Sequence, residues 1–290
     1  MARRAVSFQR QTGAYYTCPE AALAMAEWVL GNGARTALEP SFGDGAFVHA
    51  LRAAAEKRAG GEVEVFGAEL VAETYDKALS TCILDPSHAH LGDFLAWDVP
   101  TVDAVIGNPP YVRLRNAAKD QCSRALAVSA RELGAPMETG GSVWMPFVLH
   151  AARALASGGR MALVLPFDLT YVRYARPLWR WLGAAFGGLR LARVHQRIFP
   201  EILQDVVVLY ADRRGGQTDH VRFDAFASVD DFLHGSPLHR SDVSIAAVGG
   251  GERALMRALL PCELLADLDG PLARASVPVR SRCAFNIGYV

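Results

Sequence analysis

The sequence has no hydrophobic run long enough to cross a membrane. Its longest uninterrupted apolar run is seven residues, Met161 to Phe167, whereas a membrane-spanning helix requires about 18–20. No apolar stretch follows the basic residues at the N-terminus, as a secretory signal peptide would require. We therefore predict a soluble protein of the cytoplasm without a membrane partner.

Cysteine is scarce and scattered. The chain has five cysteines and no C-x-x-C pair, which argues against both a disulfide framework and a structural zinc site. His88 and His90 have a spacing seen in metal sites, but no third ligand accompanies them. We interpret them as loop histidines and predict that the protein binds no metal.

The composition is that of a globular protein, with 290 residues of which 51% are hydrophobic and 21% charged. Its 30 basic and 30 acidic residues cancel overall but not locally. Residues 1–100 carry 8 basic and 13 acidic side chains (net −5), and residues 101–215 carry 15 and 8 (net +7). This asymmetry indicates an anionic ligand for the middle of the chain. Chance segregation of surface charge explains it equally well.

Short β-type runs alternate with Ala/Leu-rich helical stretches up to about residue 212, a pattern typical of parallel βαβ units. We expect strands at 36–41, 63–70, 89–91, 103–107, 160–165, 189–195 and 206–211. Helices are expected at 19–30, 46–58, 72–79, 143–157 and 175–185. The fold class is thus α/β, and ligands of such sheets bind beyond the carboxyl ends of the strands.

The pattern changes after this region. Residues 221–226 alternate like another strand, a helix is expected at 252–268, and the chain stops at 284–290 in what looks like an unfinished strand. We therefore expect a main domain over residues 1–225. Residues 226–290 would form a linker and the beginning of a further C-terminal region, in a truncated chain.

A glycine-containing loop, Glu39-Pro40-Ser41-Phe42-Gly43-Asp44-Gly45, follows the first expected strand. Glycines at a strand-to-helix turn permit close approach of a ligand. The loop lacks the third glycine of the dinucleotide fingerprint and the lysine of a phosphate-binding loop. A plain structural turn remains the alternative.

Acidic residues stand at the ends of the next two expected strands. Glu69 lies where nucleotide-binding folds place a carboxylate that binds ribose. Asp93, after the third strand, could accept a hydrogen bond from an adenine amino group. Each has a structural alternative: Glu69 as a surface cap of the following helix, and Asp93 as an N-cap or turn aspartate.

The fourth expected strand leads into Asn108-Pro109-Pro110-Tyr111. Proline restricts its own φ and the backbone of the preceding residue, so this loop is stiff. The Asn108 side-chain oxygen and the Pro109 carbonyl can each accept one N–H of a planar amine, and the Tyr111 ring can stack on the base that carries it. Such a loop at a strand's carboxyl end indicates chemistry at an NH₂ group rather than an ordinary turn.

Five motifs in one order carry a resemblance to a known family. Thr12-Gly13-Ala14-Tyr15-Tyr16-Thr17, E-P-x-x-G-x-G, G-x-E, G-D-F and N-P-P-Y resemble those of the gamma-type adenine-N6 DNA methyltransferases of bacterial restriction–modification systems. The resemblance covers residues 10–212. It implies a Rossmann-like methyltransferase fold, with a mostly parallel seven-stranded sheet and helices on both faces. One departure is Cys18, where the family usually has proline.

The resemblance also implies S-adenosylmethionine as cofactor and assigns roles to individual residues. The implied cofactor-binding residues are Thr17, Glu39, Pro40, Ser41, Gly43, Gly45, Glu69, Leu70, Asp93, Phe94, Asn108 and Phe147. The implied catalytic residues are Asn108, Pro109, Pro110, Tyr111 and Phe199, the last as a second aromatic beside a flipped base. For Phe199, a simple core position is the alternative.

The resemblance implies double-stranded DNA as the partner. A target adenine in such a duplex must leave the base stack to be methylated. Arg113, Arg115 and Lys119 follow the N-P-P-Y motif and are the predicted DNA contacts, with Arg124 and Arg131 beyond them. A solvated surface cluster is the alternative. A cognate restriction endonuclease, or a missing C-terminal domain that recognises the target sequence, is a further possible partner.

The sequence leaves three other classes of function open. Glutamine-N5 protein and guanine-N2 RNA methyltransferases share N-P-P-Y chemistry but generally lack the segment at residues 12–17. A nicotinamide-dependent oxidoreductase is disfavoured by the incomplete glycine fingerprint. A DNA-binding module without activity is disfavoured by the intact Asn108 and Tyr111.

Overall fold

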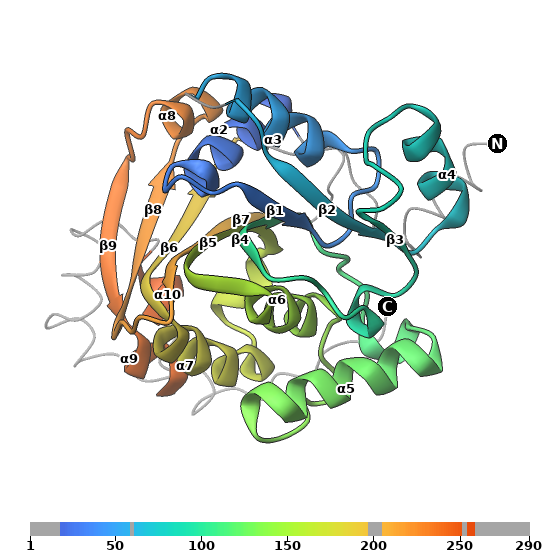
Figure 1. Cartoon of the computed structure of the whole chain (residues 1–290). Helices are drawn as coiled ribbons and strands as arrows, with labels where there is room; N and C mark the ends of the chain where they lie inside the picture. The colour runs from blue at the N-terminus through green and yellow to red at the C-terminus, as the bar shows by residue number, and fades with distance from the viewer. Residues whose placement is uncertain (1–17, 59–60, 197–204, 251–253, 259–290) are drawn as a thin grey trace, which may run out of the picture.

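The computed structural model describes residues 18–58, 61–196, 205–250 and 254–258. The strands are β1 (Thr36–Glu39), β2 (Glu64–Glu69), β3 (Ala89–Leu91), β4 (Val102–Gly107), β5 (Leu155–Pro166), β6 (Phe186–Val194), β7 (Val206–Arg214), β8 (His220–Phe226) and β9 (His239–Ser244). The described strands form one sheet in the order β3-β2-β1-β4-β5-β7-β6-β8-β9 (Figure 1).

The sheet is mixed. From β3 to β5 all neighbours are parallel, and β6 is parallel to β8, whereas β7 runs antiparallel to both β5 and β6. β9 pairs antiparallel with β8 at the edge. The expected α/β class is confirmed, but the expected seven strands are corrected to nine in the described residues. The alternating segment 221–226 joins the same sheet, and the charged, exposed residues of β9 suit an edge strand.

Helices cover both faces of the sheet (Figure 1). They are α2 (Pro19–Leu30), α3 (Ala46–Glu56), α4 (Ala72–Ser80), α5 (Lys119–Leu133), α6 (Trp144–Arg153), α7 (Arg176–Ala185), α8 (Val229–Leu233), α9 (Ile245–Gly250) and α10 (Ala254–Arg257). Apolar side chains of α2, α3, α4 and α8 form the core on one face, and those of α5, α6, α7, α9 and α10 form the core on the other.

The helix expected at 143–157 is shorter in the structure. α6 ends at Arg153, and β5 already begins at Leu155, opposite Val102 of β4. The Val102 N–H donates to the Ala154 carbonyl. Pairing with β4 therefore determines where this helix ends, and the glycines at 158 and 159 lie inside β5.

α5 was not expected from the sequence. It buries only Ala125, Val128 and Ser129, and the remaining residues are polar or partly exposed. A helix with so narrow an apolar stripe gives a weak periodic signal. It follows directly after the N-P-P-Y loop and its short helical turn η2 (Leu114–Asn116).

The expected domain boundary at residue 225 falls inside β8, and β9 extends the same sheet to Ser244. The division into a main domain and a C-terminal region stays a prediction, since residues 259–290 lie outside the described part. Of the helices in that part, none combines the length and the apolar character that crossing a bilayer demands.

Candidate active site

The loops after β1, β2, β3 and β4 carry most of the predicted site residues. These four strands are parallel neighbours in the sheet, so their carboxyl ends meet at one edge, where open α/β sheets bind ligands. The fold therefore brings together residues that are up to 69 positions apart in the sequence, from Glu39 to Asn108. Thr17 and Phe199 lie outside the described residues, and their roles stay predictions.

The two glycines of the first loop meet different requirements. Both adopt positive φ angles, +53° at Gly43 and +83° at Gly45, a conformation that other residues rarely adopt. A Cβ on Gly45 would lie 2.5 Å from Cγ2 of Ile83, so this glycine is required by packing. A Cβ on Gly43 would meet no atom within 4 Å. Gly43 is thus the glycine beside open space, where a ligand could approach the backbone.

Glu69 connects the second loop to the first. Its Oε2 accepts a hydrogen bond from the Gly43 N–H (3.1 Å), and its Oε1 accepts one from the Val71 N–H (2.8 Å). Burial raises the pKa of the Glu69 carboxyl, although these N–H groups partly oppose the shift. Each carboxylate oxygen keeps a lone pair for a further donor. The neighbouring Leu70 side chain is 57% exposed and leaves an apolar surface beside the carboxylate.

Glu39 is buried, and neither of its carboxyl oxygens has a hydrogen-bond partner among the described residues. Burial raises the pKa of this carboxyl well above its usual value, and the charges of Asp44 and Glu69 raise it further. An unpaired buried carboxylate is unfavourable. A cationic group of a ligand would give it a partner, so the residue fits the ammonium group of a bound amino acid moiety. Pro40 follows it at the end of β1 and is buried.

Asp93 caps the short helix η1 (Phe94–Ala96), where its Oδ1 accepts a hydrogen bond from the Leu95 N–H. Its Oδ2 accepts one from Nη1 of Arg124 on α5, at 3.1 Å. The Asp93 side chain is only 7% exposed, whereas that of Arg124 is 42% exposed. Arg124 was expected among the DNA contacts, and its partner in the structure is instead the carboxylate predicted to bind adenine.

Phe94 and Phe147 are core residues in this structure. They are 2% and 4% exposed, and their ring centroids lie 5.0 Å apart. Phe94 also contacts the ring of His150. A role of either ring against the cofactor adenine stays a prediction, and their burial favours the packing role.

The N-P-P-Y loop leaves the end of β4 and is held by several hydrogen bonds. The Tyr111 hydroxyl lies 2.6 Å from Asn108 Oδ1 and 3.1 Å from the Val164 carbonyl oxygen. A carbonyl oxygen has two lone pairs, so Asn108 Oδ1 can accept one further N–H. Pro109 is buried and Pro110 half-buried. No hydrogen bond to the Pro109 carbonyl occurs among the described residues.

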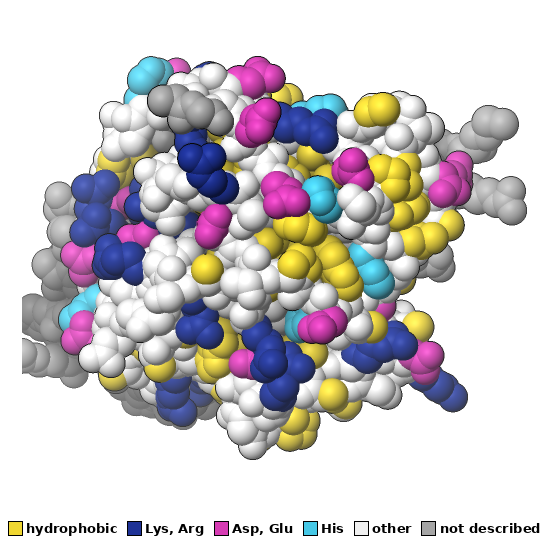
Figure 2. Space-filling view, in the orientation of Figure 1, with side chains coloured by type: hydrophobic (Ala, Val, Ile, Leu, Met, Phe, Trp, Pro, Cys, Tyr) yellow, Lys and Arg dark blue, Asp and Glu magenta, His cyan; other side chains and the backbone are white. Residues whose placement is uncertain are grey.

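The predicted DNA-contacting residues differ in their surroundings. Nη2 of Arg113 lies 3.3 Å from Oδ2 of Asp168, whose Oδ1 accepts a hydrogen bond from the Tyr171 hydroxyl. Arg115 and Lys119 are exposed and form no ion pair within the described ranges. On the face of the molecule that Figure 2 shows, Lys and Arg side chains lie in the lower part, where α5 and α7 lie in Figure 1.

The sequence did not indicate Asp168, which pairs with the predicted DNA contact Arg113. It stands 55 positions from Arg113 in the sequence, and no motif marks it. Only the neighbouring placement of β4 and β5 brings the two residues together. In the described part of the chain, no group of three or more His, Cys, Asp or Glu side chains is placed to hold a metal ion.

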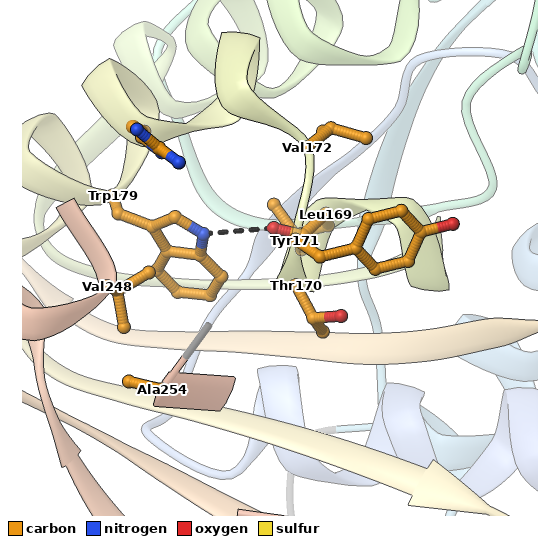
Figure 3. A pocket seen from close by; sticks show the side chains of 8 residues that line it. Leu169, Thr170, Tyr171, Val172, Trp179, Val248 and Ala254 are labelled. Carbon is orange, nitrogen blue, oxygen red and sulfur yellow. Dashed lines mark hydrogen bonds between the residues drawn. The ribbon is translucent and has the colours of Figure 1, made fainter. Parts of the chain in front are cut away.

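A small hollow lies beyond β5, between the helical turn after that strand, α7 and α9 (Figure 3). Its lining includes Leu169, Tyr171, Trp179 and Val248, and the Trp179 indole N–H donates to the Leu169 carbonyl at 3.1 Å. None of the predicted site residues lines it. The hollow is therefore separate from the site at β1–β4.

Solved structures share this fold. A type I restriction–modification methyltransferase subunit from Streptococcus thermophilus aligns with a TM-score of 0.63 and 18% identity, over 83% of this chain and 58% of that one. A putative class I S-adenosylmethionine-dependent methyltransferase from Listeria monocytogenes aligns with a TM-score of 0.58 and 16% identity, over 73% of this chain and 65% of that one. The restriction–modification enzyme LlaBIII, solved bound to DNA, aligns with a TM-score of 0.61 and 10% identity, over 79% of this chain and 22% of that one.

At these identities the similarity shows the fold, and the chain spans roughly half the length of the type I modification subunits it matches. The family itself is shown by the sequence: residues 1–173, more than half of the chain, match the N-6 DNA Methylase family. The match includes the loops after β1, β2, β3 and β4, with Glu39, Glu69, Asp93 and Asn108. The chain belongs to the N-6 DNA Methylase family.

Proposed function

We propose that this chain transfers a methyl group from S-adenosylmethionine to the N6 amino group of adenine in DNA, within a restriction–modification or related defence system. The observation that carries the proposal is the stiff loop Asn108–Tyr111 at the end of β4, beside the ends of β1 and β2, where Glu39 and Glu69 are the last strand residues. An acceptor for a planar amine thus lies next to acceptors suited to a nucleoside and an ammonium group.

The residues present fit the cofactor. Glu39 has a buried carboxyl without a partner, Gly43 adjoins open space, and Glu69 keeps free lone pairs beside the exposed Leu70. Glu39 would hold the ammonium group, Glu69 the ribose hydroxyls, and Asp93 the adenine amino group. When bound there, the cofactor supplies an electrophilic methyl group on its sulfonium.

The chain's own contribution to the reaction is positioning of the amine. The N6 lone pair of adenine is delocalised into the ring and is a poor nucleophile. If Asn108 Oδ1 and the Pro109 carbonyl each accept one N–H, the nitrogen is favoured in a pyramidal form and its lone pair is directed at the methyl group. This is catalysis by orientation and preorganised electrostatics.

The DNA substrate requires a flipped base, because N6 is inaccessible to the enzyme inside the duplex. Stacking on an aromatic ring contributes about 1–3 kcal/mol per base, and Tyr111 is the proposed platform, with Phe199 as its predicted counterpart. Exposed Arg115 and Lys119 would contact phosphates. LlaBIII, which shares the fold, has been solved with DNA.

The partner that recognises the target sequence belongs to the same proposal. A separate domain that recognises the target sequence is a proposed partner. Residues 226–244 complete the sheet, so within the predicted region 226–290 a contribution to recognition is proposed only after Ser244. A cognate endonuclease is a further proposed partner. We also propose the cytoplasm as the location of the protein, because the DNA of a bacterium, the proposed substrate, lies in that compartment.

Transfer of labelled methyl from S-adenosylmethionine to unmethylated DNA tests the function, with RNA and a protein extract as parallel acceptors. We expect label in DNA as N6-methyladenine and a loss of about 100-fold or more in Asn108→Ala, with cofactor affinity retained. Asn32→Ala is the matched control, because Asn32 precedes β1, at the end of the strand opposite to the site, and its side chain donates to the Gly158 carbonyl. Label in protein or RNA instead of DNA would refute the DNA assignment.

A further inference from the structure

Ser41 links the loop after β1 to the loop Asn108–Tyr111, the proposed catalytic loop. Its hydroxyl donates a hydrogen bond to the main-chain carbonyl oxygen of Asn108 at 3.1 Å. The strands before these loops are parallel neighbours, with Leu38 opposite Val105. The two loops therefore leave the sheet side by side.

The contact between the loops extends one residue further back. A Cβ on Gly107 would lie 2.6 Å from Oε1 of Glu39, so the Glu39 carboxyl fills the space beside the Gly107 backbone. Two consecutive residues of the catalytic segment, Gly107 and Asn108, thus rest against Glu39 and Ser41. The side chain of Asn108 meanwhile bonds to the Tyr111 hydroxyl.

The catalytic loop needs such external support. Pro109 and Pro110 have no N–H, so this part of the loop cannot hold itself by backbone donors. Its far end is also held from outside, because the Ser142 hydroxyl and the Val143 N–H both donate to the Val112 carbonyl at 2.9 Å. Serine hydroxyls therefore hold main-chain carbonyls at both ends of the motif.

We propose that Ser41 is a positioning residue that fixes the main chain of Asn108, so that the Asn108 amide is presented to the target base. The proposal rests on the proposed methyl transfer. It differs from the predicted cofactor-binding role, because a hydroxyl has a single hydrogen. In Ser41 that hydrogen is engaged with Asn108, and only the oxygen lone pairs are left for a ligand.

Ser41→Ala tests the proposal, with Ser80→Ala as the matched control. Ser80 also donates its hydroxyl to a main-chain carbonyl, that of Lys77, at 2.8 Å, but it lies on α4. We expect single-turnover methyl transfer at saturating cofactor to fall about tenfold in Ser41→Ala, because misorientation slows the reaction. The cofactor dissociation constant should change less than about twofold, and Ser80→Ala should match the wild type in both.

Hydrogen exchange gives a readout that does not depend on activity. Peptides that cover residues 106–114 should exchange faster in Ser41→Ala than in the wild type or in Ser80→Ala. Unchanged exchange, or an unchanged saturated rate combined with weaker cofactor binding, would overturn the proposal and return Ser41 to the cofactor role. If the wild type methylates no DNA, the proposed function fails, while the exchange result still decides whether Ser41 holds the loop.

Discussion

The Tyr111 hydroxyl donates a 2.6 Å hydrogen bond to Oδ1 of Asn108, the oxygen expected to accept an N–H of the target amine. The aromatic residue of the motif therefore has two separable parts, a ring for stacking and a hydroxyl that orients the asparagine. Replacing each part in turn should separate their contributions.

Tyr111→Phe keeps the ring and removes the hydroxyl. We expect the methyl-transfer rate to fall roughly two- to tenfold, the usual worth of one hydrogen bond. Tyr111→Ala removes the ring as well and should cost a further 10- to 100-fold or so, from lost base stacking. Single-turnover assays of the two variants check this. Equal losses in both would show that the hydroxyl, and not the ring, is what matters.

Arg124 and Arg115 should affect different ligands. Arg124 pairs with Asp93 in the predicted cofactor site, whereas Arg115 is exposed and lies beyond the catalytic loop. Arg124→Ala should weaken cofactor binding about two- to fivefold, as expected for a partly exposed ion pair, and leave the salt dependence of DNA binding unchanged. Arg115→Ala should leave cofactor binding unchanged. It should lower by about 0.9 the slope of the logarithm of DNA affinity against the logarithm of salt concentration. Titrations of each ligand with both variants measure this. A reduced salt slope in Arg124→Ala would restore its predicted role at DNA.

The buried carboxyl of Glu39 predicts a pH dependence of stability. Because the folded protein raises the pKa of this carboxyl, the folded state binds a proton more tightly than the unfolded chain does. The stabilising contribution is complete below the unfolded pKa of 4.5 and is lost as pH rises through the higher folded pKa. Glu39→Gln should therefore gain melting temperature relative to the wild type as pH rises above the usual pKa of a glutamate.

Thermal melts of the cofactor-free protein at several pH values check this expectation, with Glu73→Gln on the exposed surface of α4 as control. The Glu39→Gln variant should also bind the cofactor more weakly, since the neutral amide cannot pair with an ammonium group. A stability difference that does not vary with pH would contradict the assignment of an unpaired, buried carboxyl.

The sequence predicted the part of the molecule that local signals encode. Hydrophobic runs indicated the strands that lead to Glu39, Glu69 and Asn108, because strands buried on both faces are continuously apolar. The alternation of elements indicated that their ends would meet. α2 was predicted with its observed ends, since Pro19 begins it and Gly31 follows its last residue.

Features set by long-range contacts were not predictable. The start of β5 depends on pairing with Val102, and the place of β8 and β9 depends on which sheet edge is open to them. The partners of polar side chains were equally hidden, because the Arg124–Asp93 pair joins residues 31 positions apart and no periodic pattern marks it.

The order of the strands separates the predicted site from one edge of the sheet. The predicted residues of β1–β4 lie at the carboxyl ends of those strands, whereas β8 and β9 form the far edge and carry none of them. A neighbouring domain that packs against β9 would therefore leave the loops after β1 and β4 uncovered.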